Sequence, residues 1–248
     1  MPEFAPFLIL FGVGLVAGTI NVMAGGGSTL TLPTLIFLGL DAAAANGTNR
    51  VAIALQNIFA TISFRQEKVS RFRQSLTFAL WAMPGAVVGA VVAVQISDAW
   101  FQRILGIVMV GVVISMLIPR RGIAETTPEG VRSWWIYPAL FGIGFYGGFI
   151  QMGVGFLFMA AFYHLLKMNL VFVNMHKVVV VLLYTGPTLL VFALTDNVDW
   201  TLGLSLAAGN ALGAWWAAKL AVRRGEKFIR YVLIVAVLIM AAKILGAF

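Results

Sequence analysis

Hydrophobic residues form long uninterrupted runs along this chain, separated by short polar stretches. A membrane-spanning helix needs about 20 mainly apolar residues. Runs of that order occupy 5–24, 44–64, 75–96, 101–118, 134–152, 171–194, 200–218 and 228–247. Two further runs, 29–40 and 154–166, are too short to span, and each follows a glycine-rich break. The pattern predicts an all-α integral membrane protein in which two short helices belong to hairpins that enter the membrane and turn back.

The order of these runs repeats in the two halves of the chain. Matching positions are Phe11–Gly14 with Phe141–Gly144, Gly18 with Gly148, Arg50 with Lys177, Gly85 with Gly209, and Gly89 with Gly213. Each half then holds one broken hairpin and three spanning helices, which gives repeats at 1–118 and 134–248 joined by a linker at 119–133. Internal repeats with glycine breaks at corresponding positions are typical of transporter binding sites.

Basic residues gather in three stretches between the hydrophobic runs. They are Arg65, Lys68, Arg71 and Arg73; Arg120, Arg121 and Arg132; and Lys219, Arg223, Arg224, Lys227 and Arg230. Because Lys and Arg are enriched in cytoplasmic loops, we expect 65–73, the linker and 219–230 in the cytoplasm. The turn 195–199, which has acids and no cation, then lies outside.

This orientation makes the two halves inverted copies of each other, with the N-terminus outside. Each hairpin must return to the side from which it entered. Ten full crossings also suit the first two basic loops, but they require 29–40 and 154–166 to span with only 12 and 13 residues. We therefore expect re-entrant hairpins.

The composition supports a membrane protein and excludes several kinds of site. Hydrophobic residues make up 61% of the 248 and charged residues 10%, whereas soluble domains are roughly 45–50% apolar and about 25% charged. The chain has no cysteine and only two histidines, which excludes disulfides, thiolate metal sites and a histidine-rich metal cluster. The net charge of +8 comes from basic loops, so it does not indicate a nucleic-acid partner. We expect no cofactor.

Two cations, Arg50 and Lys177, lie just inside long apolar runs and correspond in the repeat. A charge inside a membrane costs several kcal/mol unless it is paired or hydrated. No acid close in sequence pairs with either residue, so an anionic substrate is one candidate partner. The alternative is that both side chains extend to opposite membrane interfaces.

The glycine breaks are the strongest single motif. They contain Gly25, Gly26, Gly27, Ser28 and Thr29 in the first half and Gln151, Gly153 and Gly155 in the second. Glycine lets the backbone unwind at little steric cost, and the N-terminus of the following helix attracts anions. We expect the two helix ends to meet near the membrane midplane around one ligand. Close packing of helices through small residues is the alternative explanation.

Polar residues also follow the breaks along the next helix of each half. Asn46, Asn49, Arg50 and Asn57 share one face, and Asn174, Lys177, Tyr184 and Thr185 form a similar stripe, with His176 opposite Asn49. Asn46 or Thr48 is a candidate helix cap. His176 can protonate near neutral pH, although a histidine at a helix start is also common at an interface. Neutral ligand donors are expected from Asn21, Asn49, Asn57, Gln151 and Tyr184.

The segments Gly14–Gly18, Gly25–Ser28, Pro33 and Ala45–Asn49 resemble the TauE/SafE sulfite exporter family of membrane transporters (the 4-toluene sulfonate uptake permease type). The likeness covers essentially the whole chain. The second half departs from it at Asn174–Lys177, where small polar residues are expected. The resemblance implies transport of sulfite, sulfoacetate or another organosulfonate, or of related carboxylates.

Together these features predict a secondary transporter of a small anion in the bacterial inner membrane, working by alternating access. Export of a sulfur-containing anion follows from the resemblance alone. An anion channel and an uptake carrier for a small carboxylate stay open as alternatives. A membrane enzyme is not expected, because the sequence has no cysteine, histidine pair or paired carboxylates. The expected partners are the substrate and membrane lipid; the pattern leaves oligomeric state and coupling ion undetermined.

Overall fold

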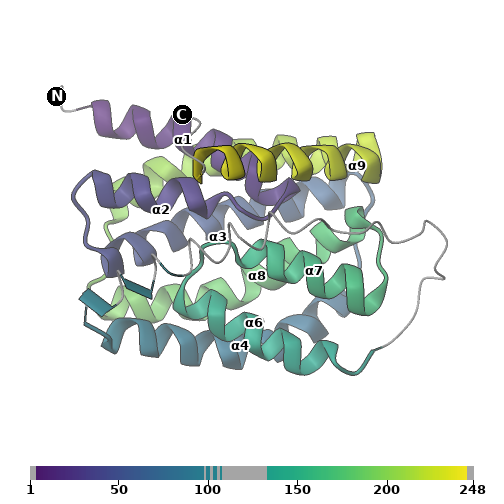
Figure 1. Ribbon diagram of the computed structural model, residues 1–248, viewed down its shortest axis with the longest axis horizontal. Helices are drawn as coiled ribbons and strands as arrows, with labels where there is room; N and C mark the ends of the chain where they lie inside the picture. Colours follow the sequence, from purple (N-terminus) through teal and green to yellow (C-terminus); the bar gives the residue numbers. More distant parts are fainter. Residues whose placement is uncertain (1–3, 98, 101–102, 105–106, 108–132, 245–248) are drawn as a thin grey trace.

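The computed structural model describes residues 4–97, 99–100, 103–104, 107 and 133–244. Its long helices are α1 (Ala5–Met23), α2 (Ser28–Phe37), α3 (Ala42–Gln66), α4 (Phe72–Gln95), α6 (Ile136–Phe149), α7 (Val154–Leu166), α8 (Leu170–Leu194) and α9 (Trp200–Ile244). The described part of the chain contains no strand (Figure 1). The predicted all-α fold is confirmed.

Most predicted runs coincide with helices. The short helices after the two breaks begin at Ser28 and Val154, close to the predicted positions. The predicted runs 200–218 and 228–247 both fall in α9, which Gly225 divides with a non-helical backbone (φ 71°, ψ −170°). The predicted run 101–118 lies almost wholly outside the described residues, as does the linker apart from Ser133.

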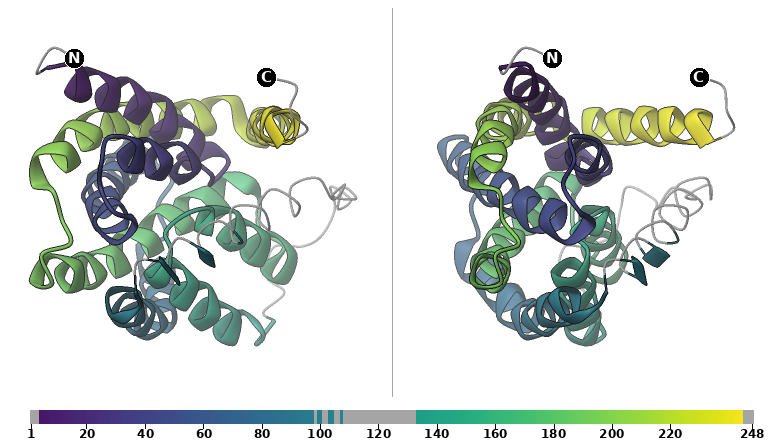
Figure 2. Two further views of the ribbon diagram at one scale, coloured as in Figure 1. Left: turned by 60° about the vertical axis from the view of Figure 1, so that its left-hand side comes forward. Right: turned by 90° about the vertical axis from the view of Figure 1, so that its left-hand side faces the viewer.

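The helices are arranged in three layers, with α1 and α9 on one side and α4 and α6 on the other (Figures 1 and 2). Helices α2, α3, α7 and α8 lie between them. The contacts of the two halves correspond pair by pair: α1 packs on α9 as α6 packs on α4, and α3 packs on α9 as α8 packs on α4. Likewise α1–α2–α3 contacts match α6–α7–α8 contacts. The layers thus repeat the order found in the sequence.

The repeated glycines lie where the outer helices cross. A Cβ atom on Gly14 or Gly18 of α1 would collide with the α9 backbone near Asn210. A Cβ atom on Gly144 or Gly148 of α6 would collide with the α4 backbone in the same way. Gly85, Gly89, Gly209 and Gly213 make the reciprocal contacts. Small residues let membrane helices approach closely, so the repeated glycines build two equivalent crossings.

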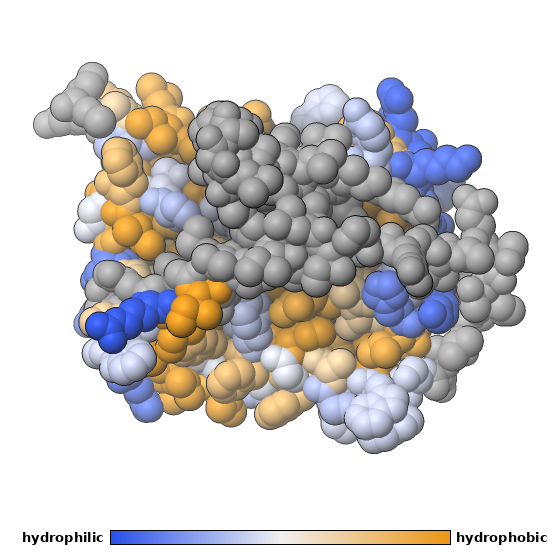
Figure 3. All heavy atoms as spheres, in the orientation of Figure 1, coloured by the Kyte–Doolittle hydropathy of each residue, from blue (hydrophilic) through white to orange (hydrophobic). Residues whose placement is uncertain are grey.

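The outer surface fits a membrane environment. Three described helices, α1, α4 and α8, are long and apolar enough to cross a bilayer. Large hydrophobic side chains such as Leu8, Trp81 and Trp216 are at least half exposed, at 72%, 50% and 64%. On the face seen in Figure 1, Figure 3 shows hydrophobic residues over the described middle and hydrophilic residues toward the ends of the long axis. Helix α3 has 25 residues but is not among the apolar spans, because its face toward the core is polar.

The two ends of α3 identify opposite ends of the bundle. At its C-terminal end, Arg223 forms an ion pair with Glu67 at 3.1 Å, which joins loop 65–73 to segment 219–230. Near its N-terminal end, the Asp199 N–H donates to Thr48 Oγ1 at 2.9 Å. The helical rise places these two contacts about 28 Å apart. The two basic stretches therefore share one end, and the 195–199 turn lies at the other.

Candidate functional site

The two glycine breaks contact each other in the middle layer. Gly25 has a left-handed backbone (φ 90°), and a Cβ atom there would lie 2.8 Å from Gly155 Cα. A Cβ atom on Gly155 would in turn meet the Gly25 backbone. Only glycine fits at both positions, because each backbone occupies the space of the other's side chain. The breaks between α1 and α2 and between α6 and α7 therefore cross, and the ligand expected between them stays a prediction.

Other residues of the breaks mainly shape the backbone. Gly26 lies against the Phe156 ring, and Gly27 lies against Ala17 O, so close packing accounts for these two glycines. The Thr29 N–H donates to Gly26 O at 3.1 Å and its hydroxyl to the same oxygen at 2.6 Å. The Thr29 amide, at the helix N-terminus predicted to attract an anion, is thus already paired in this conformation.

The start of α2 is held by α3. Asn49 Nδ2 donates to Ser28 Oγ at 3.4 Å, and Thr31 Oγ1 donates to Asn49 Oδ1 at 2.7 Å. Both Asn49 and Ser28 are buried. These two predicted ligand residues pair with each other and position the helix.

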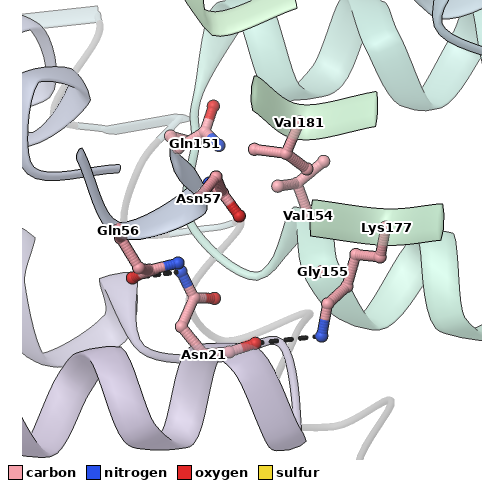
Figure 4. Close-up of a pocket in the computed structure, with 8 residues that line it drawn as sticks. All are labelled: Asn21, Gln56, Asn57, Gln151, Val154, Gly155, Lys177 and Val181. Atoms are coloured by element: carbon pink, nitrogen blue, oxygen red, sulfur yellow. Dashed lines mark hydrogen bonds between the residues drawn. The ribbon is translucent and has the colours of Figure 1, made fainter. Parts of the chain in front are cut away.

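A small cavity lies beside the crossing of the breaks. It is lined by Asn21, Gln56, Asn57, Gln151, Val154, Gly155, Lys177 and Val181 (Figure 4). Its volume is about 10 Å³, close to the space that one water molecule needs. Both halves contribute to it, and five of the lining residues are predicted site residues. The sequence also shows Gln56 as a polar residue in an apolar run, but no signal there distinguishes it as a ligand.

Lys177 reaches from α8 to the last turn of α1. Its ammonium donates to Asn21 O at 3.0 Å, to Val22 O at 2.8 Å and to Asn174 Oδ1 at 2.8 Å. Asn174 Nδ2 donates to the next carbonyl, Met23 O, at 3.4 Å. Two side chains of α8 thus satisfy the last three carbonyls of α1, which have no partners within the helix.

Arg50 makes the corresponding contacts with the last turn of α6. Its guanidinium, on α3, donates to Gly147 O at 3.3 Å, to Gly148 O and to Thr188 Oγ1 at 3.1 Å. Asn46 Nδ2 donates to Phe149 O at 2.9 Å. The carbonyls of Gly147, Gly148 and Phe149 are the last three of α6.

Each cation, together with an asparagine, therefore caps the broken helix of the opposite half. We call these the Asn46–Arg50 cap of α6 and the Asn174–Lys177 cap of α1. A cation is favoured at a helix C-terminus because the helix dipole is negative there. The exposed fractions of Arg50 and Lys177 are 0% and 3%, so neither side chain extends to a membrane interface. The alternative of interfacial cations is wrong.

The predicted helix cap also needs correction. The N-cap of α3 is Asp41, whose Oδ1 accepts from the Ala44 N–H at 2.7 Å. Asn46 instead belongs to the α6 cap, and Thr48 accepts from the distant turn at Asp199. The helix begins at Ala42, so Asn46, Asn49 and Arg50 lie in its second and third turns and Asn57 lies in its fifth. Asp41 followed by four alanines is itself a helix-start signal in the sequence, which the choice of Asn46 or Thr48 as the cap overlooks.

The two caps differ in their access to the cavity. Lys177 lines it, whereas Arg50 does not. Gln151 lies between Arg50 and the cavity: its Oε1 accepts from Arg50 Nη1 at 3.4 Å, and its Nε2 donates to Tyr184 Oη at 3.2 Å. Arg50 and Tyr184, both predicted ligand residues, thus contact Gln151, which lines the cavity, but do not line it themselves.

His176 lies away from the cavity. Its Nδ1 is 2.8 Å from Ser75 Oγ on α4, and its ring lies 5.3 Å from the Phe78 ring and 5.9 Å from the Phe162 ring. The residue is fully buried. Its polar partner is a serine hydroxyl at the α4–α8 interface, and it neither lines the cavity nor lies at an exposed interface.

Known proteins resemble this chain over nearly its whole length. The family model of the sulfite exporter TauE/SafE matches residues 10–244. A probable membrane transporter protein, YfcA, of Escherichia coli is 31% identical over 96% of this chain and 88% of its own. One from Haemophilus influenzae is 28% identical over 95% and 92%, and YunE of Bacillus subtilis is 26% identical over 89% of each. No solved structure matches the chain. The chain therefore belongs to the sulfite exporter TauE/SafE family of membrane transporters.

Proposed function

We propose that this protein exports a small sulfur-containing anion, such as sulfite, sulfoacetate or another organosulfonate, across the bacterial inner membrane by alternating access. The ligand binds between the two glycine breaks. The observation that carries this proposal is the cavity at their crossing, which combines one buried ammonium, Lys177, with four side-chain amides and no carboxylate (Figure 4).

The charge balance around the cavity favours an anion. In the described part of the chain, the acids lie in loops or at helix ends: Asp41, Glu67, Asp196, Asp199 and Glu226. No carboxylate there forms an ion pair with Lys177. A bound anion would compensate this charge, which otherwise costs several kcal/mol within a membrane. Asn and Gln amides can donate to sulfite or sulfonate oxygens while adding no charge.

The repeat and the positions of the turns support an inverted arrangement, with repeats at 1–118 and 134–248. The turn before α3 lies at the end that holds Asn197, whose carbonyl packs against Gly47. The turn before α8 lies at the opposite end, where Asn169 Nδ2 donates to Glu226 Oε2 at 2.7 Å. Helices α2 and α7 thus return to opposite ends. This fits two re-entrant hairpins in a multi-pass protein whose basic end is cytoplasmic.

The cavity has room for about one water molecule in this conformation. A sulfite ion has four heavy atoms and needs more space than one water molecule. The two halves must therefore separate on one side to admit it. Because the breaks touch through glycine backbones, a rocking of one half against the other changes access without unfolding either helix. Sites at a repeat interface commonly work in this way.

The test is transport by the purified protein in proteoliposomes. We expect saturable efflux and counterflow of sulfite or an organosulfonate, which Lys177→Met abolishes. Lys227→Met, which removes an exposed cation, is the matched control and should transport normally. Unitary currents would instead identify a channel, and uptake restricted to short carboxylates would identify a carboxylate carrier; either result would overturn the proposal.

A further inference from the structure

The surroundings of the Lys177 ammonium are those of a cation-binding site. Three oxygens lie 2.8–3.0 Å from Nζ, and Met159 Sδ lies at 3.7 Å. Two of the oxygens are carbonyls at the C-terminal end of a discontinuous helix, and the third is an amide oxygen. In secondary transporters with broken helices, such carbonyls and helix C-termini coordinate the coupling Na⁺.

The second half repeats this arrangement. The carbonyls of Gly147 and Gly148 end α6, and the guanidinium of Arg50 occupies the position in front of them. Phe192 covers the guanidinium at 4.5 Å from its ring centroid. Both broken helices therefore present carbonyls to a positive charge that is covalently attached to the opposite half.

We infer that Lys177 is a tethered substitute for a coupling cation: its ammonium fills a monovalent-cation site at the end of α1, so transport needs no Na⁺ there. This inference rests on the proposed carrier function. Arg50 fills the corresponding site at the end of α6. Because neither cation can leave, the anion crosses alone and its movement carries net charge. A negative potential inside the cell then drives the anion outward.

Removing the Lys177 side chain should leave its cation site empty and open to a free cation. Lys177→Ala leaves the carbonyls of Asn21 and Val22 and the Asn174 amide oxygen without their donor, next to an existing cavity. A small free cation can enter in its place, with oxygens of the kind that a hard cation binds. Methylammonium and n-propylammonium imitate the missing end of the side chain, and Na⁺ tests the metal itself.

The first experiment uses the wild-type protein in proteoliposomes with equal pH on both sides. We expect anion efflux rates in Na⁺ and choline media to agree within about twofold and to rise when an outward-directed electrical driving force on the anion is imposed. An obligatory Na⁺ gradient or proton gradient would overturn the inference while leaving the carrier proposal intact. Absence of any anion flux would instead contradict the carrier proposal.

The second experiment needs no transport. We expect n-propylammonium or Na⁺ to raise the melting temperature of Lys177→Ala by several degrees and to leave the wild type and Lys227→Ala unchanged. In proteoliposomes the same cation should restore flux at least about tenfold. A monodisperse variant that gains neither stability nor flux would overturn the inference. Lys177→Arg keeps the tethered charge and should remain Na⁺-independent; Na⁺-dependent flux in this variant contradicts the inference too.

Discussion

Arg50 and Lys177 cap equivalent broken helices, yet they meet different surroundings. Arg50 is enclosed by carbonyls, Thr188 and the Phe192 ring, and Gln151 separates it from the cavity. Lys177 has its carbonyl partners on one side and the cavity on the other. The comparison shows how a repeat can keep one structural contact in both halves while only one of the two charges borders the cavity.

The choice of side chain agrees with this division. A guanidinium offers five donors in a planar fork, whereas an ammonium is a compact point charge on a flexible stem. The fork suits a site with several fixed oxygens, as around Arg50. Under the proposed function, the flexible ammonium shifts between the α1 carbonyls and an arriving anion. We therefore expect Arg50 to act mainly on stability and Lys177 mainly on transport.

The largest effect should come from the contact that both halves share. Gly25→Val and Gly155→Val each place a side chain in the other break, and Gly25 also has a positive φ. Each should cost about 3 kcal/mol or more and abolish folding into a monodisperse species in detergent. Gly12→Ala and Gly142→Ala are matched controls, since no atom lies within 4 Å of a Cβ atom there. Nearly native melting of both break variants would show that the breaks do not touch.

Next in size is the difference between the two caps. Arg50→Met leaves buried carbonyls unpaired at about 1–3 kcal/mol each, partly offset by removal of a buried charge, so we expect a net loss of about 2 kcal/mol. Lys177→Met leaves the α1 carbonyls of Asn21 and Val22 facing the cavity, where water can replace the ammonium. This variant should lower the free energy of unfolding by less than about 1 kcal/mol. Thermal melting and anion flux, measured on both variants, check whether Arg50 acts mainly on stability and Lys177 mainly on transport. Equal stability losses and equal flux in the two variants would contradict this difference.

Gln56 lines the cavity, although it was not among the predicted ligand residues. Its Oε1 accepts from Asn21 Nδ2 at 3.1 Å, and both residues line the cavity. Gln56→Leu should raise the KM for the anion about 3–10-fold, the equivalent of one hydrogen bond, with little change in melting temperature. Gln66→Leu, at the end of the same helix, serves as the control. A KM unchanged by Gln56→Leu would place the anion elsewhere.

The smallest effect belongs to the charged end of the bundle. Arg223 is 60% exposed in its ion pair with Glu67, and exposed pairs contribute about 0.5 kcal/mol or less. Arg223→Ala should therefore lower the melting temperature by only about 1–2 °C and leave flux unchanged. A loss as large as that of Arg50→Met would mean that the end contacts, rather than the caps, hold the halves together.

Much of the fold was predictable, because runs of apolar residues and their glycine interruptions directly reflect membrane thickness and helix ends. The glycine pairs Gly14/Gly18 and Gly144/Gly148 were found as repeats, and they lie in equivalent crossings. Arg50 and Lys177 stand out in the sequence because both lie just inside apolar runs at corresponding repeat positions, but the sequence alone left open whether they are buried or extend to the membrane interfaces.

Their partners were not predictable. Main-chain carbonyls have no signature in a sequence, so the caps that Arg50 and Lys177 provide remained invisible. Gln56 was missed because its neighbour Asn57 shares the same polar signal, and only the packing of the breaks shows that both face the cavity. His176 was selected by position in the repeat, but packing against Phe78 and Phe162 places it elsewhere.

Binding of sulfite to the purified protein, measured by isothermal titration calorimetry with the Lys177→Met and Lys227→Met variants, tests the central claim most directly. If the Lys177 ammonium holds the anion in the cavity, Lys177→Met should bind at least about tenfold more weakly, because hydrogen bonds to charged groups contribute about 1.5–3 kcal/mol. Lys227→Met should bind as the wild type does. Equal affinity in all three proteins would contradict the account.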